Sequence, residues 1–257
     1  VLKSGDKGDA VKEAQSLLNR NGAILNLDGE FGPGTELAVR EFQDSAGLQV
    51  DGVISSAVWD ALRKLKEPSP DIPTRSVTFL CREEVGSRQQ YDAQAARPTR
   101  PGGESGVTIG VGYDLGQLKT LEADWGSLLS ADQIAALRAC VGLKGDQAEA
   151  VLKRLPAMTI PWRAAWQVFI SRTLPDFIGR TRAAFPSGST PAESIFSPAK
   201  RSLSRHAPMA LKFSSPNPSG SIREWHEAQA GFARWASICW RSDMVCPVLE
   251  SSRDGTA

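Results

Sequence analysis

The sequence has few of the residues that metal centres and thiol or histidine chemistry require. Among its 257 residues are two histidines and four cysteines, and none of the cysteines forms a Cys-x-x-Cys pair. We therefore expect no dedicated zinc site, no Cys/His nucleophile, reduced thiols in place of a disulfide framework, and no cofactor. These residues are Cys81, Cys140, Cys239, Cys246, His206 and His226.

Long apolar runs are also missing. No run approaches the roughly 18 residues that span a bilayer, so no membrane span is expected. Residues 1–20 show no basic stretch followed by an apolar core and a cleavage site, which predicts cytoplasmic synthesis without a signal peptide. The net charge is +1, too weak a basic excess to predict nucleic-acid binding.

The N-terminal part of the sequence contains an internal repeat. Asp28-Gly29 recurs as Asp51-Gly52, and a helix-like segment follows each copy. Upstream, an apolar stripe at helical spacing predicts a first helix that ends near Gly22. Its members are Val11, Ala14 and Leu18.

A second helix is expected to follow the first Asp-Gly turn. Thr35 would be its N-cap, Ala38 and Phe42 its buried stripe, and it would stop before Gly47. The pattern predicts three short helices joined by Asp-Gly turns.

Residues 2–65 resemble the peptidoglycan-binding domain type 1 family. The resemblance implies a three-helix, non-catalytic module that holds bacterial cell-wall glycopeptide. For Asp28 and Asp51 we favour a turn-forming role over ligand contact, and for Phe31 and Trp59 a place in the core over a sugar platform. The matching residues are Gly5, Gly8, Val11, Gln15, Leu18, Asp28, Gly29, Phe31, Gly32, Pro33, Thr35, Val39, Phe42, Gln43, Gly47, Leu48, Asp51 and Gly52.

A proline-rich stretch after this module favours an extended, semi-rigid spacer. We therefore divide the chain into a peptidoglycan-binding domain (1–66), a linker (67–76), a second domain (77–185) and a divergent C-terminal region (186–257). In that last region the helix-like stretch is Ser221–Trp240, and one interpretation of the region is an incomplete second lobe.

The second domain opens with a predicted helix over Val77–Glu84, which carries glutamates to a polar edge, and a loop over 85–105. The stretch 107–111 alternates as a strand does, so Thr108 points away from the core and Asp114 shares its face if the strand persists. The alternative is a β-hairpin whose glycines only shape turns and whose aspartate caps a helix beginning near Leu115.

An acidic helix end followed by Ser105–Gly116, which contains Thr-Ile-Gly-Val-Gly, resembles phage lysozyme-fold muramidases, and more closely pesticin-like and phage-type endolysins. The resemblance implies that residues 77–185 are a lysozyme-like catalytic domain. In it, Glu84 would be the general acid, Asp114 the second carboxylate and Thr108 a hydroxyl that helps to position water. Partial burial of Glu84 would raise its pKa, and carboxyl groups roughly 6.5–9.5 Å apart would give inversion.

Two alternatives stay open at this point. Glu83 adjoins Glu84, and only one of them can face a cleft because neighbouring helical side chains point about 100° apart. Asp92 nearly matches a second phage arrangement, in which the second carboxylate precedes the strand, and we rank it behind Asp114. The interpretation that we favour for Asp92 is a solvated loop aspartate.

Helical spacing returns after Gly116. Ser130 opens a predicted capping box, and Pro161 lies in the first turn of a further helix. That helix carries Trp162, Trp166 and Phe169 at core spacing, with sugar stacking by Trp162 as the minor alternative.

The predicted fold is mainly α (α+β), a three-helix module plus a lysozyme-like helical domain with a small β-hairpin. We expect a modular peptidoglycan hydrolase, a bacteriolytic and antimicrobial muramidase that acts as a monomer on peptidoglycan in the periplasm or outside the cell. The alternative is a non-catalytic wall-binding protein with a degenerate lysozyme-like domain. An amidase or peptidase is disfavoured because the metal and Ser-His-Asp sets are missing.

Overall fold

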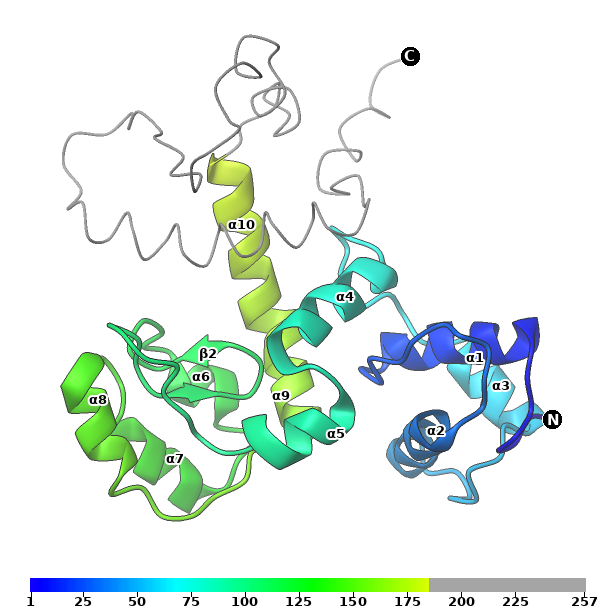
Figure 1. Ribbon diagram of the computed structural model, residues 1–257, viewed down its shortest axis with the longest axis horizontal. Helices are drawn as coiled ribbons and strands as arrows, with labels where there is room; N and C mark the ends of the chain where they lie inside the picture. Colours follow the sequence, from blue (N-terminus) through cyan, green and yellow to red (C-terminus); the bar gives the residue numbers. More distant parts are fainter. Residues whose placement is uncertain (185–257) are drawn as a thin grey trace, which may run out of the picture. The chain divides into compact units, whose positions relative to one another are not determined.

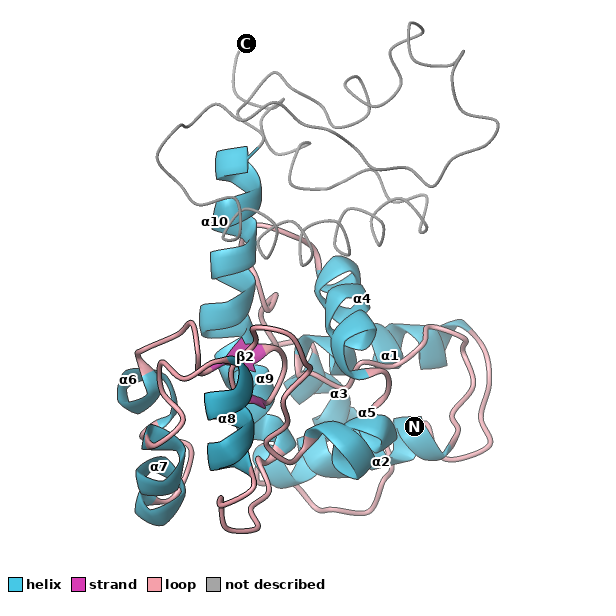
Figure 2. Ribbon diagram, turned by 60° about the vertical axis from the view of Figure 1, so that its left-hand side comes forward, coloured by secondary structure: helices cyan, strands magenta, loops and turns pink. Residues whose placement is uncertain are grey.

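The computed structural model describes residues 1–184, with side chains as far as residue 180. Most of this stretch is helical, and its sheet is one antiparallel pair of short strands, β1 (Thr108–Ile109) and β2 (Tyr113–Asp114) (Figure 2). The predicted class, mainly α with a small hairpin, is confirmed. Residues 1–178 form one compact unit. The region 186–257, including the expected helix Ser221–Trp240, lies outside the described residues.

The N-terminal module consists of α1 (Asp9–Arg20), α2 (Pro33–Ser45) and α3 (Ser56–Leu62), coloured blue to cyan in Figure 1. The predicted three helices are thus confirmed. They share one core because the apolar stripe of each helix faces the other two. Its buried members are Val11, Ala14, Leu17, Leu18, Ala23, Phe31, Ala38, Val39, Phe42, Ile54, Val58 and Leu62.

The start of α2 differs from the prediction. The helix begins at Pro33, and Gly32 is the N-cap residue, so Thr35 lies inside the first turn. Proline is favoured in the first turn because it has no amide hydrogen to leave unpaired there. Thr35 is 3% exposed. Its hydroxyl accepts a hydrogen bond from Gln15 at 3.2 Å, so this residue works in the core and not as a cap.

Helix α4 (Thr74–Val85) begins inside the range predicted as linker, directly after Pro73. The proline-rich stretch ahead of it is packed in part, since Ser69 and Ile72 are buried. Within the first compact unit, α4 packs against α1. The predicted boundary between a wall-binding and a catalytic domain remains a prediction.

The loop predicted for residues 85–105 is helical in its first half. A short helix α5 (Arg88–Gln90) runs into the π-helix η1 (Tyr91–Ala95). Ser87 and Gln90 form a reciprocal capping box that starts this segment. Few apolar residues mark it in the sequence, which is why the hydrophobic pattern did not indicate a helix there.

Beyond the hairpin the chain is again helical, as predicted. The capping box at Ser130 and Gln133 is confirmed, and Pro161 takes the N-cap position of its helix. Among the described residues, no helix combines the length and apolarity that crossing a membrane requires. The elements are α6 (Leu121–Trp125), α7 (Ala131–Arg138), α8 (Gly145–Leu152), α9 (Trp162–Val168), η2 (Phe169–Thr173) and α10 (Leu174–Ala184).

Candidate active site

Glu84 lies at the end of α4 and reaches the turn of the hairpin. A Cβ atom placed on Gly112 would lie 3.6 Å from Oε2 of Glu84. The carboxylate therefore stands beside bare backbone at residue 112, two residues before Asp114. Its side chain is exposed, so the partial burial expected for it is not found.

Thr108 and Asp114 face each other directly across the two strands. Thr108 exchanges both of its backbone hydrogen bonds with Thr99 on its other side, at 2.7 and 3.0 Å. The Thr108–Asp114 pair is therefore of the non-hydrogen-bonded kind, in which opposite side chains approach most closely. The two side chains share a face, as predicted, but through cross-strand pairing and not along one continuous strand.

The chain turns at the two glycines because both adopt positive φ, +60° at Gly110 and +69° at Gly112. This was the alternative interpretation of the stretch. Gly110 does not leave open space, since a Cβ there would lie 2.8 Å from the Trp125 ring and 3.2 Å from Ala165. A larger side chain at residue 110 would therefore collide with its neighbours.

Asp114 is half-buried and held by three hydrogen bonds. Its Oδ1 accepts from the backbone amides of Gly106, at 3.1 Å, and Gly116, at 2.7 Å. Its Oδ2 accepts from the side-chain amide of Gln117 at 3.0 Å. The bond to Gly116 closes an Asx turn, and the next helix starts only at Leu121, so Asp114 does not cap a helix near Leu115.

The alternative acids have different surroundings. Asp92 is exposed in η1, and its Oδ1 lies 2.6 Å from the Arg88 guanidinium, which also contacts Glu41 at 2.9 Å. An exposed, ion-paired aspartate agrees with the solvated interpretation that we favoured for it. Glu83 is exposed like its neighbour, but the carboxylate beside Gly112 belongs to Glu84.

Below the hairpin, Tyr113 forms a polar cluster with α6. Its hydroxyl donates to Oδ2 of Asp124 at 2.6 Å, and the Thr120 hydroxyl donates to the same oxygen at 2.6 Å. Burial, followed by this bond to Asp124, raises the pKa of Tyr113 above its ordinary range. Tyr113 therefore stays protonated and anchors β2 from beneath.

The described cysteines are free and buried. Burial raises the pKa of Cys140 to about 11 and that of Cys81 still further. Thiols of this kind are poor nucleophiles. Within residues 1–184, no group of three or more His, Cys, Asp or Glu side chains is placed to hold a metal ion. Cys239 and Cys246 lie outside the described residues.

The first Asp-Gly turn of the N-terminal module rests on a buried glutamine. Nε2 of Gln15 donates to Oδ1 of Asp28 at 2.7 Å and to the Glu30 carbonyl at 3.1 Å. Its Oε1 accepts from the Gly29 amide at 3.0 Å. Oδ1 of Asp28 also accepts from the Glu30 amide at 2.9 Å, which closes an Asx turn.

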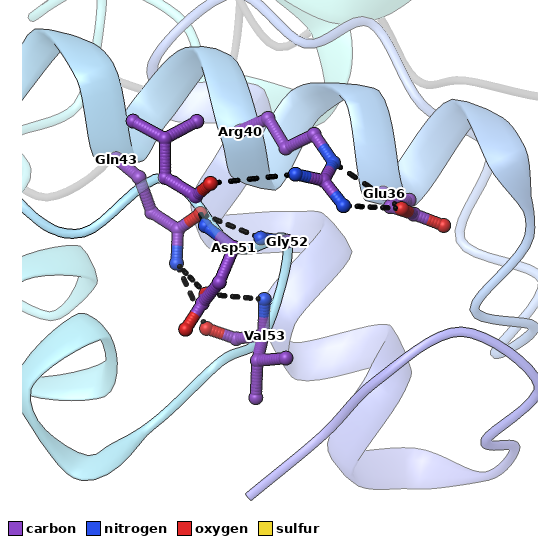
Figure 3. Close-up of polar contacts among 7 residues, drawn as sticks. Glu36, Arg40, Gln43, Asp51, Gly52 and Val53 are labelled. Carbon is purple, nitrogen blue, oxygen red and sulfur yellow. Dashed lines mark hydrogen bonds and ion pairs between the residues drawn. The ribbon is translucent and has the colours of Figure 1, made fainter.

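The second turn repeats this arrangement (Figure 3). Nε2 of Gln43 donates to Oδ1 of Asp51 at 2.7 Å and to the Val53 carbonyl at 3.0 Å, and Oε1 accepts from the Gly52 amide at 2.9 Å. Oδ1 of Asp51 accepts from the Val53 amide at 2.9 Å. The two aspartates thus build turns, the role that the sequence favoured.

Each turn glycine is also covered by a basic side chain. A Cβ on Gly29 would lie 3.1 Å from Lys12, and one on Gly52 would lie 3.0 Å from Arg40. Each basic residue precedes its glutamine by three positions, so the repeat extends into both helices. Arg40 is held in turn by Glu36 at 2.9 Å (Figure 3).

The aromatic residues considered as sugar platforms lie mainly in the core. Trp162 is 8% exposed, and its indole N–H donates to the Gly22 carbonyl at 2.9 Å. Trp166 lies against the same glycine, and both tryptophans are as buried as the core prediction requires. Phe31 is buried, whereas Trp59 is half-buried beneath the Arg63 guanidinium, 4.9 Å from its ring centre.

Residues 7–62 match the family model described as "Putative peptidoglycan binding domain". Residues 7–62 form a peptidoglycan-binding domain. The resemblance stated for residues 2–65 is confirmed, and the two glutamine-supported turns belong to this domain. The family match covers well under half of the chain, so it does not extend to the hairpin region.

Two curated proteins are similar to parts of the chain. The zinc D-Ala-D-Ala carboxypeptidase of Streptomyces albus G is 36% identical over 70 residues, which cover 26% of this chain and 28% of that protein. The spore cortex-lytic enzyme of Bacillus cereus is 28% identical over 122 residues, 47% of this chain and 44% of that protein. The chain thus spans less than half the length of either.

A solved structure, the Burkholderia AP3 phage endolysin, aligns with 70% of this chain and 85% of its own. The sequence identity is 20% and the TM-score is 0.24. At this score the likeness does not bear on the fold or on the site.

Sequence reasoning missed three supporting glutamines. Gln15 and Gln43 stand in the family pattern, and their recurrence ahead of both Asp-Gly turns was the available signal. Gln117 follows Asp114 by three residues, and nothing in the pattern distinguished it from an ordinary surface glutamine.

Proposed function

We propose that this protein is a modular peptidoglycan hydrolase, an endolysin-like muramidase that cleaves β-1,4 bonds between N-acetylmuramic acid and N-acetylglucosamine. The N-terminal domain would concentrate the enzyme on the wall, and the region that follows would cut the glycan. The observation that carries the proposal is the Glu84 carboxylate beside the turn of the hairpin that bears Thr108 and Asp114.

In the proposed reaction Glu84 donates its proton to the leaving glycosidic oxygen. Asp114, ionised, and Thr108 hold a water on the opposite face of the sugar ring. Asp114 takes a proton from this water as it attacks the anomeric carbon, and the carbon–oxygen bond to the leaving sugar breaks. This order of steps inverts the configuration of the anomeric carbon. The exposed position of Glu84 allows it to reach a polymer outside the fold.

The proposed partner is bacterial peptidoglycan, reached in the periplasm or outside the cell, by a monomer that needs no cofactor. The peptidoglycan-binding domain supports the partner. Holding enzyme and polymer together raises the effective concentration of substrate at the cleft without adding any catalytic contact.

The test is turbidity clearing of outer-membrane-permeabilised cells by wild type, Glu84→Gln and Glu83→Gln. We expect Glu84→Gln to lower the clearing rate roughly 10²- to 10⁴-fold, because a general acid is lost. Glu83→Gln, the matched control on the same helix, should clear at nearly the wild-type rate. Undiminished clearing by Glu84→Gln would remove this residue from the mechanism.

Two further readouts separate the other functions. Pelleting with purified walls in the absence of any clearing would favour the non-catalytic wall-binding protein. New free amines without new reducing ends would identify a peptidase or amidase in place of a glycosidase.

A further inference from the structure

The two carboxylate oxygens of Asp114 have partners of different kinds. Within the described part of the chain, Oδ1 accepts from two backbone amides, those of Gly106 and Gly116. These two glycines lie close together, since a Cβ on Gly106 would come within 2.6 Å of the Gly116 Cα. Oδ1 therefore ties two backbone segments together, and its position is fixed by the hairpin itself.

Oδ2 is bound by a side chain instead. Its partner is the amide of Gln117, an exposed residue three positions on. A hydrogen bond at the surface contributes little to folding, because water replaces it readily. Because two backbone amides already hold Oδ1, the bond to Gln117 restrains the rotation of Oδ2 about that anchor and occupies one lone pair of Oδ2.

The remaining lone pair of Oδ2 is free of the bonds that hold the hairpin together. Thr108 lies directly opposite, in the close, non-hydrogen-bonded kind of cross-strand pair. A water held between a carboxylate oxygen and a hydroxyl needs both acceptors at fixed positions. Of the two oxygens of Asp114, Oδ2 is the one whose position a surface side chain controls.

We propose that Gln117 is a positioning residue that orients Oδ2 of Asp114 as the atom that receives the proton of the attacking water. This inference rests on the proposed muramidase reaction. Gln117 exchanges no proton. In this proposal Oδ1 stabilises the hairpin, and Oδ2 accepts the proton of the attacking water.

The experiment compares two substitutions in the full chain. Gln117→Met keeps the length of the side chain and removes its N–H donor, whereas Gln117→Lys keeps a donor and changes the shape. Gln94→Met and Gln94→Lys are matched controls at an exposed glutamine of η1. Reducing-end release from soluble glycan fragments gives kcat and KM, and thermal unfolding shows that each variant is folded.

We expect Gln117→Met to lower kcat about tenfold with KM nearly unchanged, because orientation matters in the transition state and not in binding. Gln117→Lys should recover most of this loss, and both Gln94 variants should behave as wild type.

Two results would overturn the positioning role while leaving the proposed function in place. One is a wild-type kcat for Gln117→Met while Glu84→Gln and Asp114→Asn are inactive. The other is a larger loss of kcat in Gln117→Lys than in Gln117→Met, which would indicate that the shape of the side chain, and not its N–H donor, matters. If the wild type releases no reducing ends, the proposed function fails and the positioning role fails with it.

Discussion

The two Asp-Gly turns of the N-terminal domain and the Thr108–Asp114 hairpin share one local hydrogen-bonding motif in different surroundings. Asp28, Asp51 and Asp114 each accept a hydrogen bond on Oδ1 from the amide two residues on, at 2.9, 2.9 and 2.7 Å. Each aspartate also accepts from a glutamine side chain. The local motif is thus shared, although the chain places it in two unrelated settings.

The settings differ in where the glutamine lies and which oxygen it binds. Gln15 and Gln43 are 1% exposed and bind Oδ1, the oxygen that already closes the turn. Gln117 is exposed and binds Oδ2. A buried glutamine bound to the oxygen that closes the turn indicates a carboxylate with a structural role. A surface glutamine bound to the other oxygen is compatible with a carboxylate that also contacts a ligand.

The largest expected effect comes from Asp114→Asn compared with Asp28→Asn. Asparagine keeps an acceptor for the turn amides in both places but removes the charge. Asp114→Asn should lower reducing-end release roughly 10²- to 10⁴-fold, since a general base is lost, with the fold retained. Asp28→Asn should stay within about twofold of wild type. Equal rates in the two variants would break the distinction.

The next largest effect is on stability. Gln15→Ala and Gln43→Ala should each lower the free energy of unfolding by about 3 kcal/mol, because buried amides and carbonyls lose their partners. Gln117→Ala should change it by less than about 0.5 kcal/mol, as exposed substitutions usually do. Urea unfolding measures all three, and a cost at Gln117 matching that at Gln15 would show that it too is structural.

A smaller effect is expected at the hairpin turn. Gly112→Ala and Gly103→Ala should each cost about 1 kcal/mol, because both positions have positive φ, +69° and +57°. The methyl group at 112 would also lie 3.6 Å from Glu84 Oε2, whereas residue 103 faces open space. The two variants should therefore lose similar stability in thermal unfolding, and reducing-end release should fall only for Gly112→Ala. Equal reducing-end release by Gly112→Ala and Gly103→Ala would show that the contact between Glu84 and the turn has no part in the reaction.

The last prediction concerns acid. The pKa of Asp28 lies below its ordinary value of 3.8, through the amide of Glu30 and then the side chain of Gln15. The pKa of Asp51 is lowered in the same way, first by the Val53 amide and then by Gln43. A folded pKa below the unfolded one adds stability above the unfolded value, and this stability is lost as pH falls through the folded pKa.

The double variant Asp28→Asn/Asp51→Asn should therefore lose less stability than wild type between pH 5 and pH 2. Thermal unfolding across this range measures the difference. If the double variant and the wild type lose the same stability between pH 5 and pH 2, the turns do not favour the ionised form of these two aspartates.

The sequence was sufficient for elements that one local pattern defines. The stripe of Val11, Ala14 and Leu18 is buried as predicted, and Ser130 caps its helix as predicted. Prediction was wrong where neighbours in space decide. Thr35 has the composition of an N-cap, but Pro33 starts the helix earlier and Gln15 draws the hydroxyl into the core.

The candidate site was predictable only in part. The spacing from Thr108 to Asp114 placed both side chains on one face, yet the turn at two positive-φ glycines, and not a longer strand, produces that face. The approach of Glu84 to Gly112 brings the end of α4 to the turn of the hairpin, 28 positions further along the chain. No local pattern encodes such a contact.

The most direct test of the central claim, that Glu84 and Asp114 serve one reaction, is a double-mutant cycle on reducing-end release from purified peptidoglycan. Residues that act as a unit have strongly non-additive effects. We predict that Glu84→Gln/Asp114→Asn is no slower than the slower single variant. Single losses that multiply in the double variant, or single variants as fast as wild type, would contradict the claim.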